Sequence, residues 1–175
     1  MKRPHLEHVL RAAAAITGET EFVVLGSQAV LAQFPAPPDG MLVSVEADLY
    51  PLHHPELADV IDGCIGRDSP FHATFGYYAD GIGPETALLP PDWDQRAVRF
   101  TSPSTGGAVA IVPEIHDLAA SKLMAGREKD LAWVTAAVEA GIVDPAVLTV
   151  RVAAIGADDA VRAVAIGRAQ RLKGR

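Results

Sequence analysis

Two stretches decide the fold: "FVVLGSQAVLAQF", residues 22–34, and "VSVEADLYP", residues 43–51. The first is typical of a buried strand that passes through a Gly-Ser turn into a helix, because Ser27 is a favourable first residue for a helix. The second predicts another strand, extending over 41–51. Since side chains alternate along a strand, Glu46 and Asp48 are expected on one face of it.

The two acids of this strand form a candidate metal site. Adjacent same-face positions are roughly 7 Å apart at their Cα atoms, so both carboxylates can reach one cation. Two like charges held together are unfavourable unless a cation or proton compensates them. Mg²⁺ accepts one or two protein carboxylates together with substrate phosphates, and Mn²⁺ is the other candidate. Taken alone, Glu46 and Asp48 also fit a solvated strand face.

The turn before the helix is a candidate phosphate site. A strand that ends in Gly26 and Ser27 and enters a helix exposes backbone N–H groups and the positive end of the helix dipole. Gly26 permits close approach of a ligand to the backbone, and Ser27 adds a hydroxyl. Together with a following strand that bears two acids, the turn predicts a phosphate and metal pair.

These stretches resemble the motif of the nucleotidyltransferase superfamily: an apolar strand, Gly-Gly or Gly-Ser, a helix, and a strand with acid-x-acid. A closer resemblance is to bacterial nucleotidyltransferase-like proteins related to the AbiEii and MenT toxins. In those proteins a later helix carries Lys and Asp in a pattern similar to "HDLAASKLMAGREKDL", residues 116–131. The motifs bracket about residues 20–131.

The resemblance implies a function. Gly26 and Ser27 would hold a nucleoside triphosphate, with Lys122 and Arg127 as further nucleotide contacts. Glu46 and Asp48 would bind the metal and, with Lys122 and Asp130, make up the catalytic set. The product would be a nucleoside monophosphate attached to an RNA such as tRNA, or to a protein hydroxyl, with release of pyrophosphate. A toxin role with a separate antitoxin is also implied.

The sequence departs from the motif in three ways. Eighteen residues separate Ser27 from Glu46, an excess that the Pro-rich loop over 35–40 can absorb. The first acid is Glu46 where Asp is usual, and residues 96–112 offer no third carboxylate; these two departures favour a different interpretation. A non-catalytic module that binds nucleotide or a partner on the same fold is therefore the main alternative. A third possible function is that of a structural interaction protein, in which Glu46 and Asp48 are solvated surface residues.

Lys122 is expected to start from the inward side of its helix. Ile115, Leu118, Ala119 and Lys122 follow one apolar stripe of the helix that begins at 114. A lysine there either covers the core with its stem or finds an anion. Asp130 could pair with it or orient it, and favourable charge at a helix N-terminus is the plain explanation for Asp130.

The remaining pattern indicates an α+β fold: a minimal nucleotidyltransferase-like mixed sheet with helices over 1–113, then a C-terminal helical bundle over 114–175 packed on it. Residues 67–92 give no clear pattern, and their aromatic residues are expected in the core rather than in a pocket wall. The other elements are expected as helices over 4–17, 55–65, 114–125, 128–140, 145–155 and 158–172, and as strands over 96–102 and 107–113.

Composition sets the outer limits. The 175 residues carry a net charge of -7, which argues against a surface coated for nucleic-acid binding, although residues 151–175 carry +4 and the rest carries -11. This basic tail fits a solvated helix end or a polyanion contact. No apolar run reaches the roughly 18 residues that span a bilayer, so no membrane contact and a cytoplasmic location are expected. Cys64 is the only cysteine and is expected to be a buried, inert thiol.

Overall fold

The structure is a computed structural model and describes residues 1–172, which form an α+β fold, as the sequence predicts. The strands are β1 (Glu21–Leu25), β2 (Glu46–Pro51), β3 (Tyr78–Gly81), β4 (Val98–Phe100) and β5 (Val109–Val112). The α-helices are α1 (Arg3–Thr17), α2 (Val30–Gln33), α3 (Ala58–Ile65), α4 (Pro70–Phe75), α5 (Trp93–Arg96), α6 (Ile115–Ala125), α7 (Glu128–Glu139), α8 (Pro145–Ala154) and α9 (Asp159–Leu172). Short 3₁₀ turns η1 (Ser27–Ala29), η2 (Asp39–Met41), η3 (Pro55–Leu57), η4 (Pro84–Thr86) and η5 (Pro103–Thr105) connect them.

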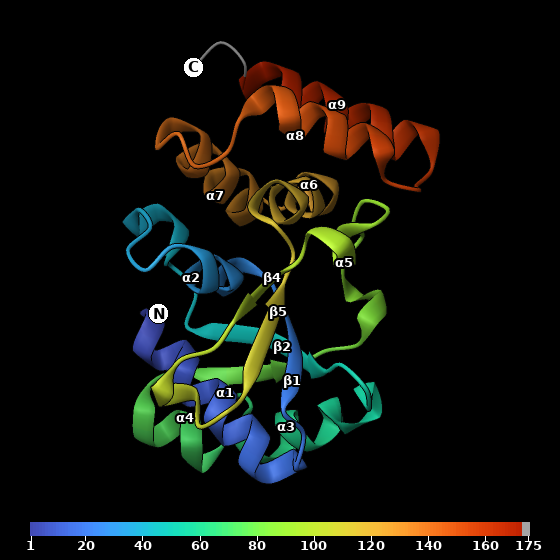
Figure 1. Cartoon of the computed structure of the whole chain (residues 1–175). Helices are drawn as coiled ribbons and strands as arrows, with labels where there is room; N and C mark the ends of the chain where they lie inside the picture. Colours follow the sequence, from blue (N-terminus) through green and yellow to red (C-terminus); the bar gives the residue numbers. More distant parts are fainter. Residues whose placement is uncertain (173–175) are drawn as a thin grey trace. The chain divides into compact units, whose positions relative to one another are not determined.

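The five strands form one mixed sheet in the order β3-β2-β1-β5-β4 (Figure 1). The central strand β1 is antiparallel to β2 and parallel to β5. The edge strands continue this mixture, since β3 is parallel to β2 and β4 is antiparallel to β5. The mixed sheet of the predicted fold class is therefore confirmed.

The chain divides into two compact units. The first contains Met1–Pro37, Leu42–Thr86 and Val98–Val112, and so holds the sheet with α1 to α4. The second contains Pro38–Met41, Ala87–Ala97 and the described residues from Pro113 onward, and so holds α5 to α9. Two short segments from within the first 113 residues thus belong to the helical unit.

In the first unit, α1, α3 and α4 cover one face of the sheet and α2 lies on the other (Figure 1). The helix α1 buries Leu6, Val9, Leu10 and Ala13, the stripe that its helical spacing predicts. The strand β3 packs directly on α3, because a Cβ atom on Gly81 would lie only 2.0 Å from the carbonyl oxygen of Ala58. This contact identifies the covered face of the sheet at its β2–β3 edge.

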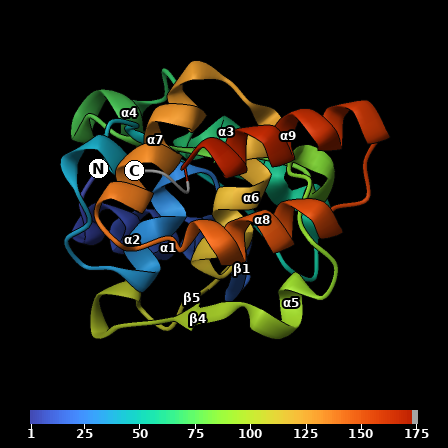
Figure 2. The same ribbon diagram turned by 90° about the horizontal axis from the view of Figure 1, so that it is seen from above.

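In the second unit, α6 is the central helix, and α7, α8 and α9 pack around it (Figure 2). Its inward side carries the predicted stripe, with Ile115, Leu118 and Ala119 all buried. The helix ends at Gly126, whose φ of 65° is easily adopted by glycine. The four predicted C-terminal helices are all present with bounds that agree to within a residue, and they form the expected bundle.

The predicted strand over 41–51 is correct only from Glu46. The amino group of Met1 donates hydrogen bonds to the carbonyl oxygens of Leu42, at 3.0 Å, and Ser44, at 2.9 Å. These carbonyls are therefore satisfied without a neighbouring strand. Alternation along the predicted strand would place Val43 and Val45 on the apolar face opposite Glu46 and Asp48, but their exposed fractions are 84% and 46%. Alternation alone could not reveal this competing partner.

Other expectations also need correction. The helix expected after Ser27 is a 3₁₀ turn followed by only one turn of α-helix in α2. Cys64 is exposed rather than buried. The unassigned segment contains α4 and β3, and its aromatic residues are only partly core: Tyr78 is buried, whereas Phe75 is 46% exposed and its ring contacts His8.

Candidate functional site

The Gly-Ser turn lies beside the second predicted acid. In the antiparallel pairing of β1 and β2, Leu25 is the partner of Asp48, so Gly26 and Ser27 leave the sheet next to that aspartate. A Cβ atom on Gly26 would lie 1.6 Å from Asp48 Oδ2, so the carboxylate rests against the glycine Cα. Gly26 has φ 66° and ψ -166°, a conformation almost confined to glycine. The structure thus brings together Gly26, Ser27 and Asp48.

Glu46 and Asp48 lie on the face of β2 opposite α3. Leu49 follows Asp48 in β2, is fully buried, and is the register partner of Gly81 in β3. Because Gly81 packs against α3, Leu49 also points to the face that α3 covers. Because successive side chains alternate, Glu46 and Asp48 point to the other face, and both are partly exposed. The acids therefore belong to an accessible face of the strand.

A third carboxylate, Asp80, stands next to this pair. It is the register partner of Asp48 in the parallel pairing of β2 and β3, and paired residues on adjacent strands project to the same face. Partial burial raises the pKa of Asp80, and the nearby charges of Glu46 and Asp62 raise it further. The sequence prediction missed this residue because it sought a third acid only in 96–112.

Glu46 is held by two neighbours. The Tyr78 hydroxyl donates a 2.7 Å hydrogen bond to Glu46 Oε2, and Arg67 Nη2 lies 3.4 Å from the same oxygen. Burial and this hydrogen bond raise the pKa of Tyr78 to about 12, so its proton stays in place at neutral pH. The Arg67 guanidinium also stacks over the Tyr78 ring, 5.2 Å from its centre. One oxygen of Glu46 is therefore already satisfied.

The donor set fits a hard cation with few protein ligands. Across residues 1–172, no group of three or more His, Cys, Asp or Glu side chains is arranged to hold a metal ion by itself. The available ligands near Gly26 are carboxylate oxygens, which suit Mg²⁺ or Mn²⁺ rather than Zn²⁺. With one or two carboxylates, such an ion needs phosphate oxygens and waters to complete its coordination. The residues thus fit a metal that binds together with a triphosphate.

Lys122, Arg127 and Asp130 form an ion-pair cluster in the second unit. Lys122 Nζ lies 3.2 Å from Asp130 Oδ1, and both side chains are buried. Arg127 Nε donates to Asp130 Oδ2 at 2.6 Å, while 64% of the Arg127 side chain is exposed. Burial alone would raise the pKa of Asp130, but the Arg127 hydrogen bond and the Lys122 charge outweigh it, so this pKa is lowered.

Lys122 is therefore a buried residue with an anionic partner, rather than a lysine whose stem only covers the core at the surface. Its ammonium is also 5.1 Å from the centre of the Trp133 ring, a distance that permits a cation–π interaction. Both explanations offered for Asp130 fit the structure, because it pairs with Lys122 and also lies in the first turn of α7. The inward position of Lys122 on α6 agrees with the stripe prediction.

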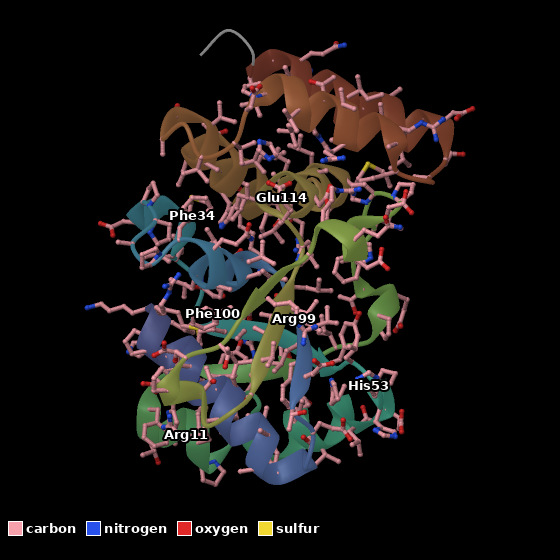
Figure 3. The ribbon with its side chains drawn as sticks, viewed as in Figure 1. Arg11, Phe34, His53, Arg99, Phe100 and Glu114 are labelled. Atoms are coloured by element: carbon pink, nitrogen blue, oxygen red, sulfur yellow. The ribbon has the colours of Figure 1, made fainter. Side chains whose placement is uncertain are left out.

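The two histidines that follow β2 each contact a carboxylate of their own. His53 Nε2 lies 3.1 Å from Glu21 Oε2, and Arg99 pairs with the other oxygen of Glu21 (His53 and Arg99 are labelled in Figure 3). His54 pairs with Glu19 at 2.7 Å. Each imidazole thus has its own carboxylate partner, and the pair does not converge on one point.

Gln28 was also missed by the sequence prediction. It follows Ser27 directly and is fully buried, yet its side-chain Oε1 and Nε2 atoms have no hydrogen-bond partner within the described part of the chain. Buried amides are normally paired, and an unpaired one is unfavourable by about 1–3 kcal/mol. The sequence gives no signal for this, because burial of a Gln depends on tertiary packing.

A family model described as "Nucleotidyltransferase of unknown function (DUF6036)" matches residues 4–165. The chain belongs to this family. Membership supports the nucleotidyltransferase superfamily predicted from the motifs, whereas the closer relationship to AbiEii and MenT toxins stays a prediction. No curated protein and no solved structure is significantly similar to the chain. Within residues 1–172, every helix is too short or too polar to cross a membrane.

Proposed function

We propose that the protein is a metal-dependent nucleotidyltransferase that moves a nucleoside monophosphate from a nucleoside triphosphate to an acceptor hydroxyl and releases pyrophosphate. The observation that carries this proposal is the contact between the Asp48 carboxylate and the Cα of Gly26. It supports the proposal because it brings the acidic strand next to the Gly-Ser turn, as expected for a phosphate and metal pair. Family membership supports the same reaction class.

In this proposal the turn holds the triphosphate. The Asp48 carboxylate fills the space beside the Gly26 Cα, so the phosphate contacts proposed here are the backbone N–H groups that follow Gly26 and the Ser27 hydroxyl. The helix dipole contributes less than the sequence suggested, because only η1 and the four residues of α2 follow the turn. In this proposal the turn's own N–H and hydroxyl donors, together with the metal ion, contribute more to phosphate affinity than a helix dipole does.

Glu46 and Asp48 would hold Mg²⁺ or Mn²⁺. When bound, this ion supplies positive charge that neutralises the phosphates and polarises the reacting phosphorus. The Tyr78 hydroxyl fixes the orientation of Glu46. Asp80, the register partner of Asp48 on the adjacent strand, is the carboxylate placed to accept the proton of the attacking hydroxyl.

The roles of the second cluster are also part of the proposal. Lys122 and Arg127 are expected to neutralise phosphate charge, and Asp130 to hold the lysine ammonium in place. The resemblance to toxins suggests tRNA or another RNA, or a protein side chain, as acceptor, and an antitoxin as partner. A cytoplasmic location agrees with those acceptors.

A non-catalytic nucleotide-binding module is the second candidate. It is favoured by the engagement of Glu46 with Tyr78 and Arg67, which occupies one oxygen that a metal would otherwise use. The two candidates make the same prediction for triphosphate binding and differ in turnover.

Turnover separates them. The protein is incubated with Mg²⁺, each α-³²P-labelled triphosphate, and total RNA, purified tRNA or total cell protein as acceptor, and both labelled product and pyrophosphate are measured. We expect label transfer that is lost in Asp48→Asn and kept in Asp39→Asn, a matched change at an exposed acid of η2. If none of the four triphosphates gives labelled product or pyrophosphate, the nucleotidyltransferase proposal is wrong and the non-catalytic nucleotide-binding module remains.

A further inference from the structure

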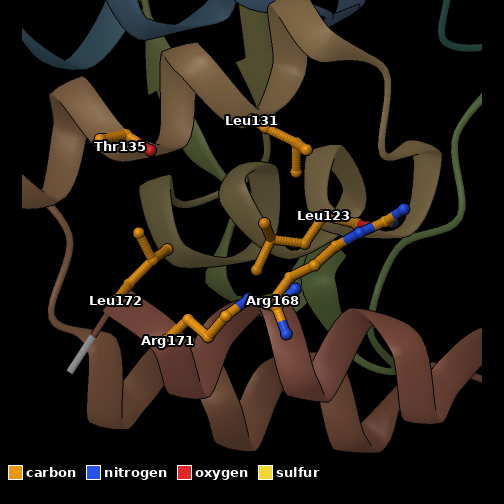
Figure 4. A pocket seen from close by; sticks show the side chains of 6 residues that line it. All are labelled: Leu123, Leu131, Thr135, Arg168, Arg171 and Leu172. Atoms are coloured by element: carbon orange, nitrogen blue, oxygen red, sulfur yellow. The ribbon is translucent and has the colours of Figure 1, made fainter. Parts of the chain in front are cut away.

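A pocket of about 250 Å³ lies within the helical unit, between α6, α7 and α9 (Figure 4). Leu123 of α6, Leu131 and Thr135 of α7, and Arg168, Arg171 and Leu172 of α9 line it. Three leucines form the apolar part of its wall, and Thr135 and two arginines of α9 form the polar part. None of these residues belongs to the proposed catalytic or nucleotide-binding set.

Arg168 is held in a fixed position. Its Nη1 atom donates a 2.7 Å hydrogen bond to the carbonyl oxygen of Leu123, in the last turn of α6. The same nitrogen lies 2.0 Å from the point that a Cβ of Gly126 would occupy, so the guanidinium packs on the glycine that ends α6. A cation there complements the unpaired carbonyls of a helix C-terminus. Arg168 is thus placed in advance of any ligand.

Arg171 adds a second guanidinium to the same pocket. Its Nη1 atom approaches to 3.6 Å of the Cβ position of Gly167, so the side chain folds back along α9 (Figure 4). Among the described residues, neither Arg168 nor Arg171 forms an ion pair with a carboxylate, whereas Arg162, on the same helix, pairs with Asp159. Two neighbouring like charges without a counter-charge are unfavourable, and an anion between them would relieve this.

We propose that this pocket binds an organic phosphate monoester with a small apolar body. A phosphate dianion matches two guanidinium groups, which donate paired N–H bonds to its oxygens. The three leucines provide an apolar surface for the carbon body, and the Thr135 hydroxyl provides one more polar contact. The volume is below the roughly 300–1,000 Å³ of pockets for drug-sized ligands, so the ligand is small.

Phenyl phosphate is a suitable probe, measured by isothermal titration calorimetry at constant ionic strength. We expect wild type to bind it at least tenfold more tightly than inorganic phosphate, because only the ester uses the leucine walls. Arg171→Met should weaken binding of phenyl phosphate at least tenfold, since it keeps the apolar stem and removes the charge. Arg162→Met, the control on the same helix, should bind as wild type does.

Three results would overturn the proposal: no binding of phenyl phosphate at 10 mM, equal affinity for inorganic phosphate, or equal affinity in Arg171→Met and Arg162→Met. Arg171→Lys, which keeps the charge, checks for loss through misfolding and should bind better than Arg171→Met. The proposal does not depend on nucleotidyltransferase activity. Asp48→Asn should therefore leave phenyl phosphate binding unchanged, even if the same variant abolishes the proposed reaction.

Discussion

Replacing Gly26 by Ala should both destabilise the protein and displace the Asp48 carboxylate. An alanine at φ 66° and ψ -166° is strained by about 1–3 kcal/mol. In addition, its Cβ would overlap Asp48 Oδ2, at 1.6 Å, so the carboxylate must rotate away. We expect a loss of about 2 kcal/mol or more in the free energy of unfolding, which lowers the melting temperature by at least about 4 °C in a chain of this size.

A double-mutant cycle separates the two contributions. In an Asp48→Ala background the carboxylate is absent, so Gly26→Ala should retain only its backbone strain, and a coupling energy of about 0.5–3 kcal/mol should appear between the two sites. Gly18→Ala is the control, because Gly18 also has a positive φ but its Cβ would meet nothing within 4 Å. Urea denaturation measures all variants. Strict additivity of Gly26→Ala and Asp48→Ala would refute the contact and with it the geometry of the site.

Three further predictions concern the charged groups. Lys122→Met should lower the free energy of unfolding, measured by urea denaturation, by about 2–3 kcal/mol. This is less than the roughly 3–5 kcal/mol expected for breaking a buried ion pair, because Arg127 still pairs with Asp130. An unchanged urea midpoint would contradict this prediction. Because the pKa of Asp130 is lowered from 3.8, its stabilising effect is complete above that value and is lost as pH falls through the folded-state pKa, so Asp130→Asn should flatten the acid limb of the stability profile. The pKa of Asp80 is raised in the folded protein, so ionisation of Asp80 lowers the free energy of unfolding as pH rises. Asp80→Asn removes this ionisation and should therefore melt at a higher temperature than wild type at pH 7, but not near pH 3. Calorimetry at the two pH values tests this.

The C-terminal half of the fold could be predicted because its signals are local. Gly126, Gly141 and Pro145 mark helix ends, and the stripe that includes Leu118 and Lys122 fixes which face of α6 is buried. The stripe placed Lys122 on the inward side of α6 but left open whether Asp130 pairs with it. Local patterns of this kind need no knowledge of distant partners.

The errors arise where a distant group decides the outcome. The Met1 amino group donates hydrogen bonds to the carbonyl oxygens of Leu42 and Ser44, and the strand begins only at Glu46, later than its alternation suggests. The strand β3 is four residues long and is paired across a crossover, which leaves too short an alternation to detect. Asp80 was missed for that reason. The unpaired amide of Gln28 is likewise a product of tertiary burial.

The most direct test of the proposed site is equilibrium binding of each nucleoside triphosphate by calorimetry, with Mg²⁺ and with EDTA, in wild type and Asp48→Asn. The site predicts that at least one triphosphate binds wild type more tightly with Mg²⁺, because the carboxylates contribute through the ion. In Asp48→Asn this dependence on Mg²⁺ should disappear while the melting temperature changes little. A triphosphate affinity that is the same with Mg²⁺ and with EDTA, or a Mg²⁺ response that survives in Asp48→Asn, would contradict the proposed role of the acidic strand.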